Sequence, residues 1–158
     1  MTPTRLLFTA AALLGLTISP VQAQNVDATS PDALILIIQE LGYKALADTD
    51  QQGDPLIRSS ANGGDFTIYF YGCNEGKDCK AIQYSKGYDM ADGMALERVN
   101  EWNKEHRFGK VYLDAEMDPY IEMDVNMDLG GVNRKNFEDT FDWWLVITRE
   151  FEEFIDWK

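Results

Sequence analysis

Hydrophobic and polar positions along the chain change their period several times, and each change predicts a new element. Between residues 31 and 41 the apolar residues recur at helical spacing, after Ser30 as N-cap and Pro31 at the first helical position. Gly42 ends this predicted helix. Short strand-like runs separated by Gly, Asp and Asn follow over Tyr43–Ala47, Leu56–Ser60, Phe66–Tyr71 and Ala81–Tyr84.

The second half of the chain predicts two helices around a hairpin. Residues 93–107 place apolar side chains on one helical face, and residues 111–128 then alternate with a period of two. The apolar positions of 111–128 are odd-numbered, so a shared apolar face needs an odd loop such as 118–120. A third helix is predicted from Arg134 to Phe154, with Asn133 as its cap. This order predicts an α+β fold, in which three helices cover a mainly antiparallel sheet.

The first 23 residues have the composition of an export signal. Arg5 provides the positive start, Leu6–Ile18 the apolar segment, and Val21-Gln22-Ala23 a cleavage site with small residues. This apolar segment is shorter than the roughly 20 residues of a transmembrane helix, and no later stretch approaches that length. We therefore expect a periplasmic or secreted protein, cleaved near Ala23, with no transmembrane segment.

The remaining chain has the length of one domain. We expect a flexible start over residues 24–29 and one folded domain over residues 30–158. The sequence carries 27 acidic residues against 14 lysines and arginines, a net charge of −13. Such a surface repels phosphate backbones, which predicts no nucleic-acid binding and leaves cationic partners, basic peptides and divalent cations as candidates.

Cys73 and Cys79 are the two cysteines of the chain. An even cysteine count at short spacing in an exported protein predicts a disulfide, here closing a turn-rich loop. If the two cysteines lie opposite each other in a hairpin, Phe70 pairs with Ile82 and the largest apolar residues share one face. A redox pair is the rival interpretation, but its usual two-residue spacing is absent.

Acidic side chains occupy the polar positions of the predicted hairpin. With a loop at 118–120, Asp114 lies opposite Asp124 and Glu116 opposite Glu122 on the solvent face. Like charges directly opposite one another destabilise a strand pair. A divalent cation, a basic partner segment, or water and salt would relieve the repulsion, so these four residues form a candidate acidic face.

The last helix carries more apolar surface than one layer requires. One stripe is wide enough to cover a sheet, and Trp143, Ile147 and Phe154 extend it around a second side. Exposed aromatic patches mark protein interfaces, so these three residues form a candidate partner surface. Burial of the helix on two sides is the alternative.

No sequence motif indicates catalysis. The chain contains no nucleophile elbow, phosphate-binding loop, zinc signature or dinucleotide fingerprint, and His106 is its single histidine. We therefore predict no catalytic residues, no metal ligands and no cofactor, and expect that the protein is not an enzyme. A carboxylate-dependent hydrolase is the third alternative, because its carboxylate pair is defined in space rather than by sequence spacing.

An ordered set of short motifs resembles the YbjN family over about residues 29–156. These motifs are Val99-Asn100-Glu101-Trp102-Asn103, Arg107-Phe108-Gly109, Tyr112-Leu113-Asp114, Ile121-Glu122-Met123-Asp124 and Gly130-Gly131-Val132-Asn133. The resemblance implies a fold like that of type III secretion chaperones and a role as a regulator of sensory transduction, without defined catalytic residues. Within the pattern, Trp102, Asn103, Phe108 and Gly109 look like a structural corner joining helix to hairpin.

Together these observations predict an exported, non-enzymatic YbjN-type module that binds a protein partner or a second copy of itself. The alternative is a periplasmic protein that binds a small ligand or a divalent cation on the acidic hairpin face. The export signal and the Cys73/Cys79 pair are departures from the usual family picture.

Overall fold

The computed structural model describes residues 25–157, so the predicted signal peptide and Gln24 lie outside the described residues. Within these described residues, three helices and eight strands follow one another, which confirms the predicted α+β class. The elements are β1 (Asn25–Val26), α1 (Pro31–Glu40), β2 (Lys44–Thr49), β3 (Pro55–Ala61), β4 (Gly64–Tyr71), β5 (Ala81–Gly87), α2 (Leu96–Glu105), β6 (Lys110–Leu113), β7 (Pro119–Asn126), β8 (Val132–Asn133) and α3 (Arg134–Phe154).

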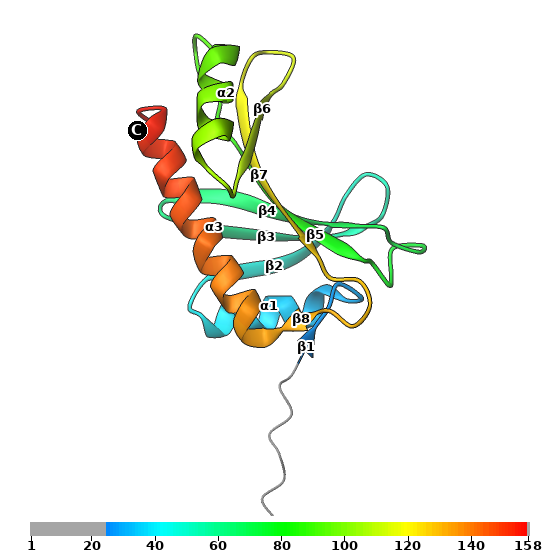
Figure 1. Ribbon diagram of the computed structural model, residues 1–158. Helices are drawn as coiled ribbons and strands as arrows, with labels where there is room; N and C mark the ends of the chain where they lie inside the picture. Colours follow the sequence, from blue (N-terminus) through cyan, green and yellow to red (C-terminus); the bar gives the residue numbers. More distant parts are fainter. Residues whose placement is uncertain (1–24, 158) are drawn as a thin grey trace, which may run out of the picture.

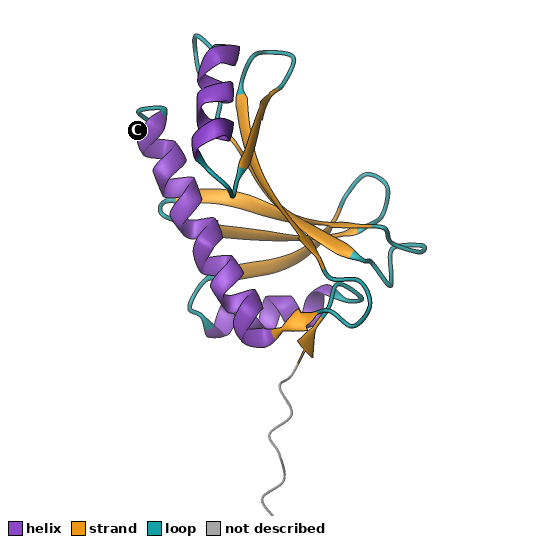
Figure 2. Ribbon diagram, in the orientation of Figure 1, coloured by secondary structure: helices purple, strands orange, loops and turns teal. Residues whose placement is uncertain are grey.

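Six strands form one antiparallel sheet in the order β2-β3-β4-β5-β7-β6, and β1 pairs with β8 in a separate two-stranded sheet. The long helix α3 runs across the large sheet, with α1 near one end of it and α2 near the other (Figure 1). The large sheet is strongly twisted, so that the β6–β7 hairpin projects away from β2–β4 together with α2 (Figure 2). None of the helices within residues 25–157 is long and apolar enough to cross a membrane.

One face of the large sheet and the inner side of α3 form an aromatic core. The Trp144 ring stacks on Tyr84 of β5 with 5.4 Å between ring centroids, and Phe141 lies 6.2 Å from Phe66 of β4. Both α3 residues are fully buried, as are Phe137 and Phe151 on the same side of the helix. The predicted apolar stripe of the last helix therefore packs on the sheet.

Side-chain caps set the start of two helices as predicted. Ser30 Oγ accepts a hydrogen bond from the Asp32 amide at 3.3 Å, and Asn133 Oδ1 accepts one from the Lys135 amide at 2.9 Å. The middle helix instead begins at Leu96, later than the predicted residue 93. Gly93 has a φ of +61°, which lies outside the range of a right-handed helix, so the helix cannot include this residue.

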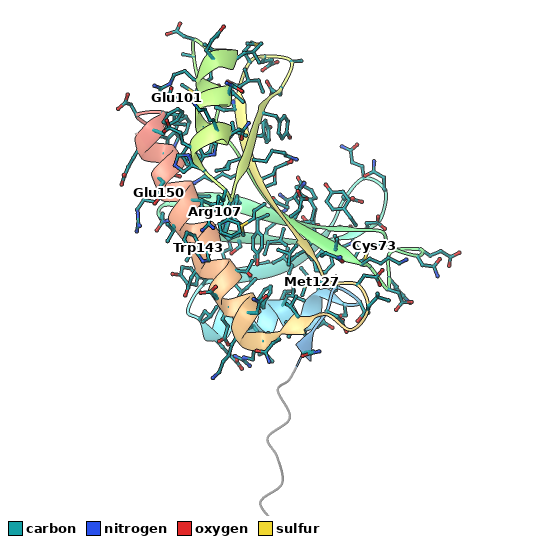
Figure 3. The ribbon with its side chains drawn as sticks, in the orientation of Figure 1. Cys73, Glu101, Arg107, Met127, Trp143 and Glu150 are labelled. Atoms are coloured by element: carbon teal, nitrogen blue, oxygen red, sulfur yellow. A yellow bond between two sulfur atoms is a disulfide. The ribbon has the colours of Figure 1, made fainter. Side chains whose placement is uncertain are left out.

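The hairpin closed by the disulfide has the predicted register. Cys73 and Cys79 are bonded, Phe70 lies opposite Ile82 in the β4–β5 ladder, and both of these apolar residues are buried. Figure 3 shows Cys73 at the end of the hairpin that lies away from α3. The disulfide therefore closes a loop at the tip of the sheet.

Replacing both Cys73 and Cys79 with serine is expected to lower the free energy of unfolding by about 2 kcal/mol. The bond closes a short loop, and a short loop restricts the unfolded chain by about that amount in the chain-entropy model. Urea unfolding of the oxidised protein and the double variant measures the difference. The parent protein in reductant should match the variant, and equal midpoints for all three samples would contradict the prediction.

The start of the domain is more ordered than predicted. Asn25–Val26 forms β1, and Val26 and Ala28 are buried, so the expectation of a flexible start over residues 24–29 is wrong for its described part. The two apolar side chains join the core, and β1 pairs with β8. At Gly131, next to β8, an added Cβ would lie 2.0 Å from the Val26 carbonyl oxygen, so the strand pair depends on a glycine there.

The β6–β7 hairpin has a different register from the predicted one. Val111 pairs with Ile121 and Lys110 with Glu122, and the turn occupies residues 114–118 instead of 118–120. Asp114 Oδ1 accepts hydrogen bonds from the Glu116 and Asp118 amides at 2.9 and 3.0 Å, which closes the turn early. This register replaces the predicted pairs of like charges with a lysine opposite a glutamate, which is favourable across strands.

Candidate functional site on the open face of the sheet

The candidate site lies on the face of the large sheet opposite the helices, here called the open face. Residues that alternate with the core positions of β4, β5, β6 and β7 point to this side. Gln83, Ser85 and Glu122 are buried there although the face is polar, whereas Tyr71 and Tyr112 remain 48% and 40% exposed. The open face thus combines buried polar groups with accessible aromatic rings.

A pocket of about 680 Å³ lies on this face across four strands. It is much more polar than the core, because its lining contains two carboxylates, one ammonium group and one amide. The lining residues are Tyr71 from β4, Ala81 and Gln83 from β5, Glu122 and Asp124 from β7, and Lys110 and Tyr112 from β6.

A chain of hydrogen bonds fixes one side of the pocket. The Tyr71 hydroxyl donates to Gln83 Oε1 at 3.2 Å, and Gln83 Nε2 donates to Asp124 Oδ1 at 2.7 Å. Gln83 and Asp124 are direct cross-strand partners, so their side chains meet on the same side of the sheet. The amide therefore holds both the tyrosine and the carboxylate in place.

An ion pair fixes the other side of the pocket. Lys110 Nζ lies 3.0 Å from Glu122 Oε2 and 5.9 Å from the centroid of the Tyr112 ring. Lys110 is more than half exposed, whereas the Glu122 side chain is only 11% exposed. The ring, the carboxylate and the ammonium group thus form one cluster at the β6–β7 pairing.

The carboxylates give the pocket a negative electrostatic potential. Burial and then the charge of Glu122 raise the pKa of the Tyr112 hydroxyl to about 12. The same two causes, in the same order, raise the pKa of Tyr71, and Asp124 adds to the effect. The hydrogen bond to Glu122 raises the pKa of the Lys110 ammonium. The shifts of the two tyrosines oppose ionisation of their hydroxyl groups, and the shift of Lys110 favours its charged form.

A second pocket of about 500 Å³ adjoins the first and shares Tyr71 with it. It is lined by the β2–β3 turn and the open face of β3 and β4, including Leu56, Arg58 and Tyr69. Arg58 Nε lies 2.5 Å from Asp48 Oδ2, so the positive charge here already has a partner. The two pockets meet at Tyr71 and are together called the groove, whose lining residues come from the β2–β3 turn at one end and from β6 at the other.

The four residues of the predicted acidic face are not all in one place. Glu122 and Asp124 line the pocket, whereas Asp114 and Glu116 lie in the β6–β7 turn because of the changed register. In the structure Glu122 pairs with Lys110, and Asp124 accepts a hydrogen bond from Gln83, so neither carboxylate lies opposite another carboxylate as predicted. Within residues 25–157, no group of three or more His, Cys, Asp or Glu side chains is placed to hold a metal ion.

The three residues of the candidate partner surface differ in accessibility. Trp143 is 41% exposed, and its ring lies 5.3 Å from that of the exposed Phe108. Ile147 is only 2% exposed, and Phe154 is half-buried with its ring 4.0 Å from the Arg98 guanidinium. Figure 3 places Trp143 midway along α3. Ile147 is thus a core residue, and the aromatic surface consists of Trp143 and Phe108.

The residues of the predicted corner join α2 to the edge of the sheet. Trp102 Nε1 donates a hydrogen bond to the Gly109 carbonyl at 2.7 Å. Asn103 Nδ2 donates to the Val111 carbonyl and Asn103 Oδ1 accepts from the Val111 amide, both at 2.9 Å. The asparagine therefore pairs with the outer edge of β6 as a neighbouring strand would.

Of the seven residues that line the open-face pocket, only Glu122 and Asp124 were predicted from the sequence. Tyr71, Gln83, Lys110 and Tyr112 were not singled out as site residues, although each lies at an outward position of a period-two pattern. The outward positions of four strands could have been collected from the sequence. Their convergence depends on the order of β5, β7 and β6 in the sheet, which no local pattern contains.

Comparison with known proteins identifies a family but no individual relative. No curated protein and no solved structure matches the chain, so the predicted likeness to type III secretion chaperones stays a prediction. The YbjN family model, described as "Putative bacterial sensory transduction regulator", matches residues 30–157. This match spans the structure from the N-cap of α1 to beyond the end of α3. The chain therefore belongs to the YbjN family.

Proposed function

We propose that this protein is an exported, non-enzymatic regulatory module that binds a protein partner on its open face. The observation that carries the proposal is the groove on this face, where Tyr71 and Tyr112 expose their rings above buried polar groups. Tyrosine is enriched in protein interfaces, because its ring provides contact area and its hydroxyl a hydrogen bond. The family's description as a sensory transduction regulator agrees with a binding role.

Two further observations support the proposed export and the proposed binding role. The apolar leader and the disulfide are both typical of proteins that leave the cytoplasm. In the open-face pocket the Glu122 carboxylate is paired with Lys110, and the Asp124 carboxylate accepts a hydrogen bond from Gln83. These polar groups thus hold one another in place beside the exposed tyrosine rings, as in a preformed binding surface.

Photo-crosslinking in living cells tests the proposal. The full chain is produced with p-benzoylphenylalanine in place of Tyr71 on the open face, or in place of Leu36 on α1 as the control. Leu36 is 56% exposed, so both probes reach solvent. Irradiation should attach one specific envelope protein to the Tyr71 probe, and the attached chain should have lost its first 23 residues.

Comparison of the two probes distinguishes binding at a specific surface from non-specific association. Equal adducts at both positions would show contact without a specific face. An absence of adducts from the Tyr71 probe, in cells that process and fold the chain, would overturn binding on the open face. An adduct on a chain that keeps its leader would overturn the proposed export.

A further inference from the structure

We propose that the open-face pocket binds the side-chain cation of an arginine or lysine in a basic segment of the protein partner. This inference rests on the proposed function and specifies the chemistry of the partner. Its basis is an arrangement that occurs twice in the pocket, a tyrosine and a carboxylate that share one neighbour, which is the Lys110 ammonium in one copy and the Gln83 amide in the other. One copy of this arrangement holds a cation of the chain itself, and the other copy does not.

The copy that is filled consists of Tyr112 and Glu122. It holds the Lys110 ammonium, with 3.0 Å between Nζ and the carboxylate and 5.9 Å between Nζ and the ring centroid. An ammonium or guanidinium group over an aromatic face is attracted by the ring, and the attraction increases with desolvation. The pocket therefore already contains one bound cation of the proposed kind.

The second copy consists of Tyr71 and Asp124, joined through Gln83. Asp124 Oδ1 accepts the bond from Gln83, and no lysine or arginine among the described residues forms an ion pair with Asp124. Two carboxylates against one ammonium leave the pocket with one net negative charge, −2 and +1. A second cation would neutralise it.

The charge of the whole molecule favours the same partner. A net charge of −13 attracts a basic segment from a distance and steers it toward the surface. A like-charged segment would be repelled. Charge complementarity thus acts both at the pocket and at long range.

The shape of the groove favours a polypeptide segment over a free amine. The neighbouring pocket shares Tyr71 and continues toward Leu56 and Arg58, so the groove is longer than one side chain needs. An extended segment can place a cationic side chain beside Asp124 and lay its next residues over Tyr69. A small amine would fill the first pocket alone.

A peptide titration with a neutral isostere tests the inference. The probes are the blocked peptide Gly-Arg-Gly-Arg-Gly and the same peptide with citrulline in place of arginine, which keeps the shape and removes the charge. They are added to mature, isotope-labelled protein, and amide chemical shifts are followed. We expect the arginine peptide to shift amides of β4, β5 and β7, and the citrulline peptide to bind about fivefold more weakly.

Two variants locate the effect. Asp124→Asn should weaken binding of the arginine peptide by about fivefold, the upper range for a partly exposed ion pair. Asp142→Asn removes the same charge from an exposed position on α3 and should leave the affinity unchanged. Equal losses in both variants would reveal non-specific charge attraction and overturn the site, as would shifts confined to α3.

Further outcomes separate the inference from the proposed function. Equal binding of the two peptides, together with a protein attached to the Tyr71 probe, would overturn the cationic chemistry and keep the protein partner. If the arginine peptide binds more tightly than the citrulline peptide but no protein is attached to the Tyr71 probe, the proposed protein partner is overturned. The inference of a basic segment in that partner then fails as well. Spermidine that binds as tightly as the arginine peptide would identify a small amine as the occupant, which contradicts the proposed segment.

Discussion

Replacing Glu152 with alanine is expected to lower the free energy of unfolding by about 3–5 kcal/mol. Glu152 Oε1 lies 2.6 Å from Lys86 Nζ, and the two side chains are only 16% and 9% exposed. The Tyr88 hydroxyl donates to the same oxygen at 3.2 Å. The variant leaves a buried ammonium group and a buried hydroxyl without their acceptor, and both losses destabilise the fold. Urea unfolding at neutral pH measures the change.

Two controls identify the cause of this loss. The double variant Lys86→Met with Glu152→Gln removes both charges, keeps an acceptor for Tyr88, and should stay within about 1 kcal/mol of the parent. Glu101→Ala breaks an exposed pair in which Arg98 Nη1 lies 3.8 Å from the carboxylate, and should leave the midpoint unchanged. A double variant as unstable as Glu152→Ala would show that lost packing, rather than the unpaired charge, accounts for the effect.

This ion pair illustrates which contacts a sequence hides. Lys86 continues the inward side of β5, after Ile82 and Tyr84, and is thus a charge at a core position. Its partner is 66 residues away on the last helix. A buried charge requires a counter-charge, but any of the 27 acidic residues in the sequence is a candidate partner for Lys86. The need for a partner could be predicted, but its identity could not.

Strand register was predictable only where a local constraint added to the alternation. In the β4–β5 hairpin the cysteine pair fixed the centre of the turn, so Phe70 opposite Ile82 was predicted correctly. In the β6–β7 hairpin the alternation fixed which side each residue faces, as the pairing of Val111 with Ile121 confirms. It did not fix the position of the turn, because several odd loops keep the same faces together. Asp114, whose side chain closes the turn, decided the register.

The functional face shows the same limit at a larger scale. The two carboxylates of the pocket, Glu122 and Asp124, belonged to the predicted acidic face. Their neighbours Tyr71 and Lys110 come from strands on either side of the β5–β7 pair. Sequence patterns give the face of a strand but not its neighbours in the sheet. The sequence could therefore predict that the open face is polar. The groove on that face could be found only once the order of the strands in the sheet was known.

Replacing Gly109 with alanine is expected to lower the free energy of unfolding by about 3 kcal/mol. Gly109 has a φ of +76°, which costs an L-residue about 1–2 kcal/mol. An added Cβ would lie 2.8 Å from Ile147 Cδ1 and 3.0 Å from Ile121 Cδ1, and such overpacking costs about 1–3 kcal/mol. Urea unfolding followed by tryptophan fluorescence suits this variant, because Trp102 donates its indole N–H to the Gly109 carbonyl.

Gly63→Ala is the matched control for this steric contact. Gly63 has a φ of +81°, and an added Cβ there would meet no atom within 4 Å. The two substitutions share the backbone cost, so Gly63→Ala should lose only about 1–2 kcal/mol. The excess loss at Gly109 then measures how tightly the corner between α2 and β6 packs against Ile147 of α3. Equal losses in the two variants would contradict the prediction, because they would show that the buried Ile147 and Ile121 side chains make room for the added methyl group at little cost.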